Sequence, residues 1–166
     1  MQAKAAYHLA AGFHTVDLLC QQAAALLFVL GLTLQLQEPL AALPPETYAA
    51  IYGRDPDTVF AGAMFPPQPA RRVPGGLEVR GRWPWGSGVM GASIVGAGIR
   101  IDGETSALPR TAIMPRDSVI VDETWDTVGL RATGSHDIVA EGVVVPEDWT
   151  FIRGGKPQQD DAIFRY

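Results

Sequence analysis

The sequence predicts an α+β protein in which N-terminal helices precede an antiparallel β-sandwich or barrel. The 166 residues include 18 glycines and 13 prolines, which are too many helix breakers for an all-helical bundle. Residues 1–45 carry only three charged side chains, Lys4, Asp17 and Glu38. From Thr58 onward, short apolar runs alternate with turn residues, a pattern typical of sheets with short strands.

The composition excludes several classes of function. Hydrophobic residues make up 47% of the chain, which excludes a disordered protein. The net charge is −5 and no basic run is longer than Arg71-Arg72, so we expect no nucleic-acid partner. The single cysteine, Cys20, excludes a disulfide within the chain and indicates a reducing, cytoplasmic location. His8 and His14 are six residues apart, a poor spacing for one helix face, and we expect no metal site.

The charge-poor N-terminal region predicts a buried helix. Its uncharged stretch runs from Leu18 to Gln37, but four glutamines interrupt it. The apolar part, 23–34, covers about 12 residues, a length that suits a buried helix better than a membrane span. Asp17 precedes the apolar part and no small-residue cleavage site follows it, which argues against a signal peptide. We therefore expect no membrane partner.

A second, short helix is predicted after Pro44. A proline fits the first turn of a helix, and Glu46 complements the positive helix end. Gly53 is a candidate left-handed terminator, and residues 54–57 read as a turn. Residues 1–57 are thus assigned to a partial N-terminal helical region.

Residues 58–153 are assigned to a β-domain, and the polar stretch 154–166 to a linker. Pro66-Pro67 should end the first strand, and turns are expected at 74–76 and at Asp102-Gly103. Pro146 should end the last strand. No helix separates the strands, so parallel pairs are not expected. The predicted strands are 59–65, 70–73, 77–80, 93–101, 111–114, 119–125 and 138–145.

The segment Gly81–Gly88 has the most informative composition. Two tryptophans flank a proline, and Gly-Ser-Gly follows. Tryptophan offers a flat apolar wall, glycine permits close backbone approach, and a serine hydroxyl can donate to or accept from a ring nitrogen. These features suit the edge of a flat heteroaromatic cofactor. A β-bulge with core tryptophans would have the same composition.

A second candidate cluster occupies 125–137. Thr133-Gly134-Ser135 could hydrogen-bond a ligand or form a turn. Arg131 could contact a phosphate or carboxylate, or pair with Asp126 or Asp137. The spacing alone leaves these alternatives open.

The order of these motifs resembles the middle β-domain of the acyl-CoA dehydrogenase superfamily. The resemblance is strongest to the branch of two-component, flavin-dependent monooxygenases that hydroxylate aromatic compounds. It extends from about Glu38 to Tyr166. The matching segments are 59–66, 73–88, 125–137 and 143–147.

The resemblance implies a flavin, FMN or FAD, lying against the β-domain. Ser87 falls near N5 of the ring, where its hydroxyl could hold a proton, and is the candidate catalytic residue. The positions that match cofactor-binding residues of the family are Ala63, Met64, Phe65, Trp85, Gly86 and Ser87.

The resemblance also implies an activity and partners. A separate NAD(P)H:flavin reductase would supply reduced flavin, and O₂ would hydroxylate an aromatic or polycyclic substrate. Family members are homotetramers and much longer, with a C-terminal helical domain that carries the catalytic base. We therefore expect a truncated member that is inactive alone, with 154–166 leading toward an absent domain. The alternatives are a fragment of an FAD-dependent acyl-CoA dehydrogenase and a non-catalytic β-domain remnant acting in protein interaction.

Overall fold

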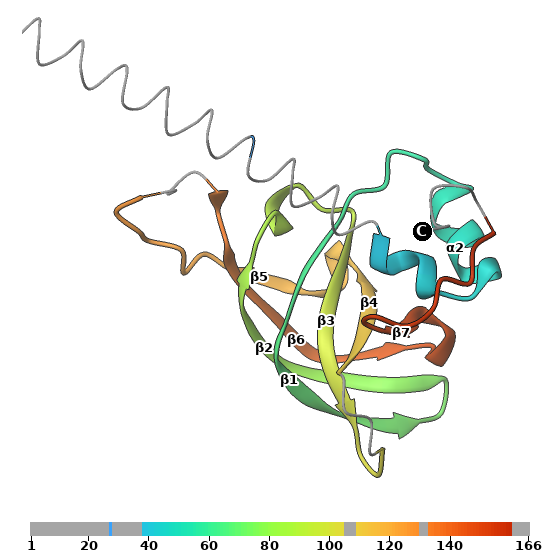
Figure 1. Ribbon diagram of the computed structural model, residues 1–166. Helices are drawn as coiled ribbons and strands as arrows, with labels where there is room; N and C mark the ends of the chain where they lie inside the picture. Colours follow the sequence, from blue (N-terminus) through green and yellow to red (C-terminus); the bar gives the residue numbers. More distant parts are fainter. Residues whose placement is uncertain (1–26, 28–37, 105–108, 130–132, 161–166) are drawn as a thin grey trace, which may run out of the picture.

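The computed structural model describes residue 27 and residues 38–104, 109–129 and 133–160 (Figure 1). Its centre is one seven-stranded sheet with the order β5-β6-β2-β1-β3-β4-β7, so the predicted α+β class is confirmed. The buried helix predicted within 18–37 lies outside the described residues, apart from residue 27. The strands are β1 (Phe60–Val73), β2 (Gly76–Gly86), β3 (Ile94–Ile101), β4 (Arg110–Pro115), β5 (Ile120–Asp122), β6 (His136–Val145) and β7 (Thr150–Ile152).

Short helices flank the sheet. The described ones are α2 (Pro45–Tyr52) and the 3₁₀ helices η1 (Glu38–Ala42), η2 (Val89–Gly91), η3 (Arg116–Ser118) and η5 (Glu147–Trp149). Among the described helices, none has the length and apolar character needed to cross a membrane.

The predicted helix after Pro44 is confirmed as α2. Its first turn contains proline and Glu46, and Ile51 is buried on its inner face. The prediction for Gly53 was wrong, because its φ of −71° and ψ of −21° are right-handed. Its amide donates to the Ala49 carbonyl at 2.8 Å, which continues the helical hydrogen bonding by one residue. The turn at 54–57 is confirmed, with the Asp57 amide donating to Asp55 Oδ1 at 3.0 Å.

The prolines do not end the first strand, which corrects the prediction for Pro66-Pro67. β1 continues through them to Val73 and so joins two predicted strands. The register between β1 and β3 shifts between Ala63 and Gln68, so the prolines fall in the irregular part of the ladder. A proline has no N–H to donate, and such an irregularity is where a strand tolerates it.

One strand pair is parallel, which corrects the prediction of a purely antiparallel sheet. β1 pairs with β3 from Phe60–Ile94 to Ala70–Ile101, whereas the other five described pairs are antiparallel. No helical crossover is needed, because β2 returns the chain to the start of β1. The connection 87–93 then passes to the other side of β1, and the amide of Ser93 donates to the Val59 carbonyl at 2.8 Å.

The turns and the edge strands agree only partly with the sequence. The turn at 74–76 is confirmed, with Gly75 at φ 95° and Gly76 at φ 143°. Asp102-Gly103 does form a turn, but β4 begins only at Arg110. β5 is much shorter than the predicted 119–125, and β6 begins two residues early and ends before Pro146 as predicted. β7 has three residues, too few to show an alternating pattern.

Glycines let β1 and β3 approach closely. A Cβ at Gly98 would lie 1.9 Å from the Met64 carbonyl oxygen, and a Cβ at Gly62 would lie 2.0 Å from the Gly96 carbonyl oxygen. The fully buried indole of Trp83 donates its N–H to the Gly98 carbonyl at 2.7 Å. Trp83 thus ties β2 to β3 in the central part of the sheet.

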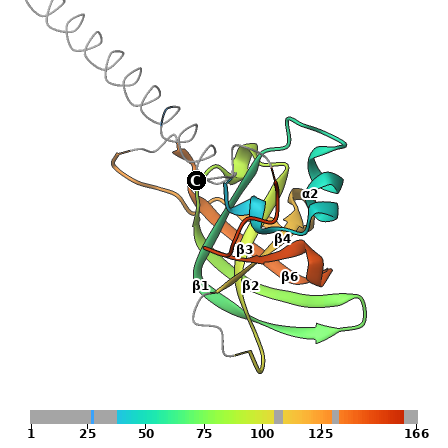
Figure 2. The same ribbon diagram turned by 45° about the vertical axis from the view of Figure 1, so that its right-hand side comes forward.

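The curved sheet encloses the main core, and a smaller core lies between the sheet and the N-terminal helices (Figures 1 and 2). Strands from both halves of the sheet, among them β3 and β6, contribute to the main core. The smaller core consists of Leu40, Leu43, Ile51, Phe60, Ile94, Ile113 and Phe151.

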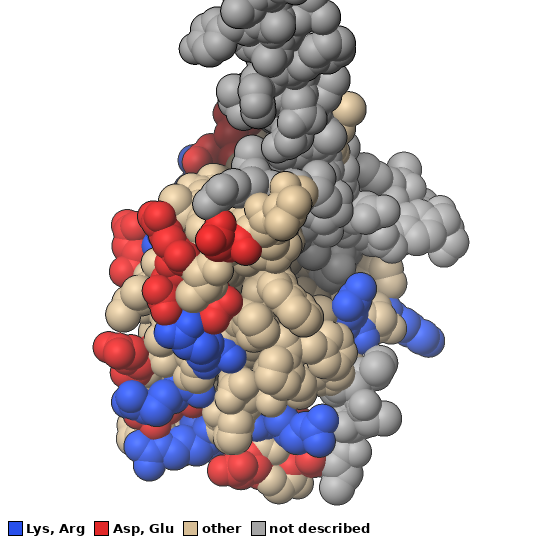
Figure 3. Space-filling model, turned by 90° about the vertical axis from the view of Figure 1, so that its left-hand side faces the viewer, with Lys and Arg blue, Asp and Glu red and all other residues tan. Residues whose placement is uncertain are grey.

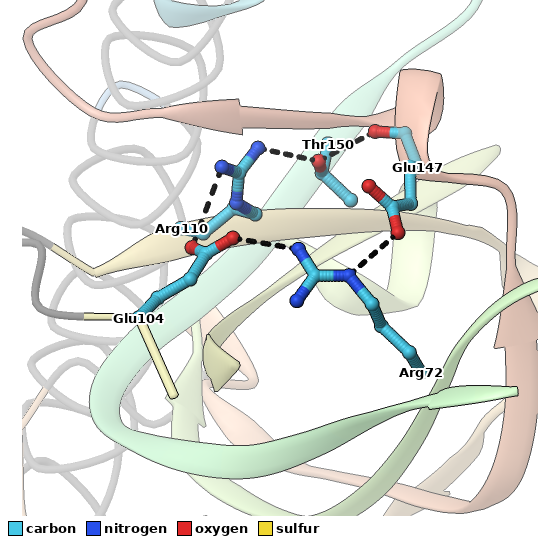
Figure 4. Close-up of polar contacts among 5 residues, drawn as sticks. All are labelled: Arg72, Glu104, Arg110, Glu147 and Thr150. Carbon is cyan, nitrogen blue, oxygen red and sulfur yellow. Dashed lines mark hydrogen bonds and ion pairs between the residues drawn. The ribbon is translucent and has the colours of Figure 1, made fainter. Parts of the chain in front are cut away.

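A network of polar side chains connects several elements beside β7 (Figure 4). Glu104 accepts from Arg72 at 2.9 Å and from Arg110 at 3.5 Å. Arg72 also donates to Glu147 at 3.0 Å, and Arg110 donates to the Thr150 hydroxyl at 3.0 Å. The network therefore connects the end of β1 with the start of β4 and with η5 and β7.

Replacement of Trp83 by phenylalanine should destabilise the fold. The Trp83→Phe variant removes buried volume and leaves the Gly98 carbonyl without its donor, so we expect a loss of about 2–3 kcal/mol in the free energy of unfolding. Urea denaturation measures this loss. Trp85→Phe is the control, because the Trp85 side chain is exposed and should change the free energy by less than about 0.5 kcal/mol. Equal losses in the two variants would contradict this account.

Candidate functional site

The predicted residues Trp85, Gly86 and Ser87 lie at the end of β2, where it meets the start of β6. Gly86 pairs with His136 in that ladder, and a Cβ at Gly86 would lie 2.7 Å from Ile138 Cδ1. Trp85 has a φ of 61°, the single non-glycine residue with positive φ in the described chain, and its side chain is 70% exposed. A strained, solvent-exposed tryptophan gains nothing from packing, and such strain is typical of functional sites.

Ser87 begins a chain of three hydroxyl groups. Its Oγ lies 2.9 Å from Ser135 Oγ, which in turn lies 3.5 Å from Thr133 Oγ1. Ser135 is 4% exposed and Thr133 is 5% exposed, whereas Ser87 is half-buried. Each hydroxyl can donate one hydrogen bond and accept others. The chain therefore leads from the interior to a hydroxyl at the surface.

Two exposed apolar side chains, those of Trp85 and Met90, come from the same part of the chain as Ser87. Met90 of η2 is 57% exposed, and its Cγ would lie 3.7 Å from a Cβ at Gly134. Gly134 has a φ of 54°, a left-handed conformation that favours glycine. Trp85 and Met90 thus present apolar surface next to Ser87 and the Thr133–Ser135 segment.

The predicted β1 residues have different environments. Ala63 is buried within the main core, Met64 is partly buried, and the Phe65 side chain is 57% exposed. Gly98 links them to β2, because it contacts the Met64 carbonyl and accepts the Trp83 N–H. The structure therefore connects the backbone at Met64 with Trp83 of β2 through Gly98, and leaves Phe65 open to solvent.

Arg82 of β2 forms ion pairs with residues of β5 and β6 next to this site. Its guanidinium donates to Asp122 at 2.6 Å and to Asp137 at 2.7 Å. The hydrogen bond that Arg82 donates to Asp122, followed by the one that it donates to Asp137, raises the pKa of Arg82 above its ordinary value. Acidic and basic side chains are interleaved on this side of the molecule (Figure 3). The alternative in which Arg131 pairs with Asp137 involves a residue outside the described ranges, and Asp137 already binds Arg82.

The sequence left the role of Thr133-Gly134-Ser135 open between a ligand contact and a turn. The structure shows a left-handed Gly134, whose carbonyl accepts the His136 amide at 2.8 Å, and a Ser135 hydroxyl that meets Ser87. Sequence reasoning missed this pairing and the role of Arg82. No sequence pattern relates two serines that are 48 residues apart.

Comparison with known proteins shows which class of protein this chain is similar to. No family model matches the chain. The chain is 60% identical over 128 residues to indole-3-acetate monooxygenase of Pseudomonas putida, covering 76% of this chain and 33% of the relative. It is 33% identical over 109 residues to the oxygenase subunit HsaA, a flavin-dependent monooxygenase of Rhodococcus jostii, covering 64% of this chain and 28% of that protein. The homologues of this chain are flavin-dependent monooxygenases.

Solved structures of such monooxygenases share the fold. A 3-HSA hydroxylase from Rhodococcus has a TM-score of 0.70 at 28% identity, over 77% of this chain and 33% of its own. XiaF from Streptomyces, in complex with FADH2 and glycerol, has a TM-score of 0.70 at 27% identity, over 80% of this chain and 33% of its own. The chain thus spans about a third of the length of the monooxygenases it matches. These matches confirm the predicted resemblance to the monooxygenase branch.

Removal of the Ser135 hydroxyl should destabilise the site. In Ser135→Ala, the Ser87 hydroxyl loses its protein partner and a buried hydrogen bond disappears, so we expect a loss of about 1 kcal/mol in the free energy of unfolding. Ser118→Ala is the matched control, since its exposed hydroxyl donates to the Pro115 carbonyl at the surface. Chemical denaturation of both variants measures the difference. A Ser135→Ala variant as stable as the wild type would contradict the buried hydroxyl chain.

Proposed function

We propose that this chain is part of a reduced-flavin-dependent monooxygenase that hydroxylates an aromatic or polycyclic substrate with O₂. One observation carries the proposal. A partly buried serine hydroxyl lies beside an exposed tryptophan at the end of β2, in a chain 60% identical to an indole-3-acetate monooxygenase. Another relative, from Rhizobium, is an FADH2-dependent resorcinol hydroxylase. Indole-3-acetate and phenols are therefore the first substrates to test.

The described residues fit a flavin ring. The exposed indole of Trp85 offers a flat face, and Gly86 has no side chain to obstruct the backbone. We assign the cofactor as reduced FMN or FAD, and the FADH2 of XiaF makes FAD the first to test. The bound reduced flavin would supply the activation of O₂. Ala63, Met64 and Phe65 would add contacts from β1.

Ser87 is the proposed catalytic residue, and its partners define what its hydroxyl can do. A hydroxyl has one proton to donate. When Ser135 accepts from Thr133 and donates to Ser87, the proton of Ser87 is free to point away from the protein. That proton would be held at the flavin N5. Trp85 and Met90 would exclude water from the same place.

The broader assignments rest on the same support. We assign the curved sheet to the acyl-CoA dehydrogenase type of middle domain. Residues 58–153 contain all seven strands of the described sheet, in agreement with the proposed β-domain, and residues 1–57 would form the helical region. Within 154–160, the side chains of Gln158 and Gln159 donate to the carbonyls of Ala42 and Leu43, so this part of the proposed linker returns to η1.

The partners follow from the proposed reaction. The whole protein would receive reduced flavin from a separate NAD(P)H:flavin reductase and would act as a homotetramer in the cytoplasm. The resorcinol hydroxylase relative is the oxygenase component of its system, which supports a reductase partner for this protein.

Loss of the Trp85 indole or of the Ser87 hydroxyl should weaken reduced-flavin binding. We expect about tenfold weaker binding for Trp85→Ala, because stacking is lost, and about threefold to tenfold weaker binding for Ser87→Ala, because one hydrogen bond is lost. Anaerobic titration of the chain with reduced FAD and reduced FMN measures the affinities. Because the chain spans a third of its relatives' length, binding is a sharper test of this region than turnover.

Val144→Ala is the control for this titration. Val144 is 49% exposed on β6 and lies beside Gly75 at the β1–β2 turn, at the opposite end of β2 from Trp85. It should leave the affinity unchanged. Equal affinities in the wild type, Trp85→Ala and Ser87→Ala would show that the flavin does not bind at this site.

A further inference from the structure

His136 makes an unusual contact with the segment that follows β5. The backbone amide of Trp125 donates to His136 Nδ1 at 3.1 Å. A ring nitrogen accepts a hydrogen bond only when it carries no proton, so this contact requires Nδ1 to act as an acceptor. Both His136 and Trp125 are half-buried.

We propose that His136 is a positioning residue of the site, whose imidazole holds Trp125 on one side and packs on the Gly134 turn on the other, so that the Ser135 hydroxyl meets Ser87. The relevance of the Ser135–Ser87 contact to flavin binding rests on the proposed function. The hydrogen bond between His136 and Trp125 does not depend on that function.

The path from the imidazole to Ser87 is short. The His136 amide donates to the Gly134 carbonyl at 2.8 Å, and a Cβ at Gly134 would lie 3.4 Å from His136 Nε2, so the Gly134 turn packs beneath the ring. Ser135 lies between these two residues and places its hydroxyl 2.9 Å from that of Ser87. Gly86, next to Ser87, pairs with His136 across the ladder. A shift of the ring would therefore move Ser135 relative to Ser87.

The next residue makes a second attachment that does not depend on the imidazole. Asp137 Oδ1 accepts from the Thr124 hydroxyl at 2.9 Å, while its Oδ2 accepts from Arg82. Consecutive β6 residues thus hold consecutive residues of the segment, Thr124 through a carboxylate and Trp125 through an imidazole. Only the second attachment depends on the imidazole.

Loss of the acceptor at Nδ1 should release the Trp125 contact, because the Trp125 amide donates to that ring nitrogen. The bond between Thr124 and Asp137 does not involve the imidazole and should remain. The effect of replacing His136 should therefore be largest at Trp125.

The test follows the Trp125 amide by NMR hydrogen exchange in the wild type and in two variants at one pH. His136→Leu removes the acceptor, so we expect the protection of this amide to fall about tenfold, the equivalent of one hydrogen bond. His136→Asn keeps an acceptor near the position of Nδ1, so its protection should stay high.

Reduced-flavin affinity is measured on the same three proteins. If it falls in His136→Leu but not in His136→Asn, the positioning role extends to the flavin. Protection that changes as expected with no change in flavin affinity would support the His136 contact and overturn the placement of flavin beside Ser87. Equal protection in His136→Leu and the wild type, or an equal loss of protection in His136→Asn and His136→Leu, would overturn the proposal.

Discussion

The close approach of β1 and β3 is the constraint on which the rest of the structure depends. A Cβ at Gly62 or at Gly98 would collide with the backbone of the other strand, and one at Gly96 would collide with the Phe60 ring. The indole N–H of Trp83 needs an acceptor because the side chain is fully buried, and the Gly98 carbonyl provides it. This contact fixes Trp83 of β2 to β3, while β1 pairs with both strands. Trp85 and Ser87 follow Trp83 by two and four residues.

The candidate site lies where regular pairing ends. The β2–β6 ladder is irregular between Trp83 and Gly86, and Trp85 takes up its strained conformation within that irregularity. The strain is tolerable because rigid contacts surround it. Trp83 anchors the preceding residues in the core, and Gly86 packs tightly on Ile138. A tryptophan held exposed by such contacts is ready to contact a ligand without reorganisation.

The sequence predicted local features well and spatial neighbours poorly. The alternation of Leu77 and Val79, the turn at 74–76 and the start of α2 depend on residues close together in the chain, and all are confirmed. The parallel β1–β3 pair could not be inferred in the same way, because it depends on β2 returning the chain. The resemblance located Trp85–Ser87, but the hydroxyl partner of Ser87 comes from a segment 48 residues away. Only the folded sheet brings the two serines together.

The site combines one rigid side with one side whose position depends on hydrogen bonds. Trp85 and Gly86 belong to β2, whose place is set by core packing, so their geometry should vary little with conditions. Ser135 follows a left-handed glycine in a segment that is attached by the side chains of His136 and Asp137. The hydroxyl groups can orient one another only while each oxygen stays within hydrogen-bond distance of the next. The hydrogen bonding of Ser87 therefore depends on the position of Ser135 beside β6, even though Ser87 itself follows β2.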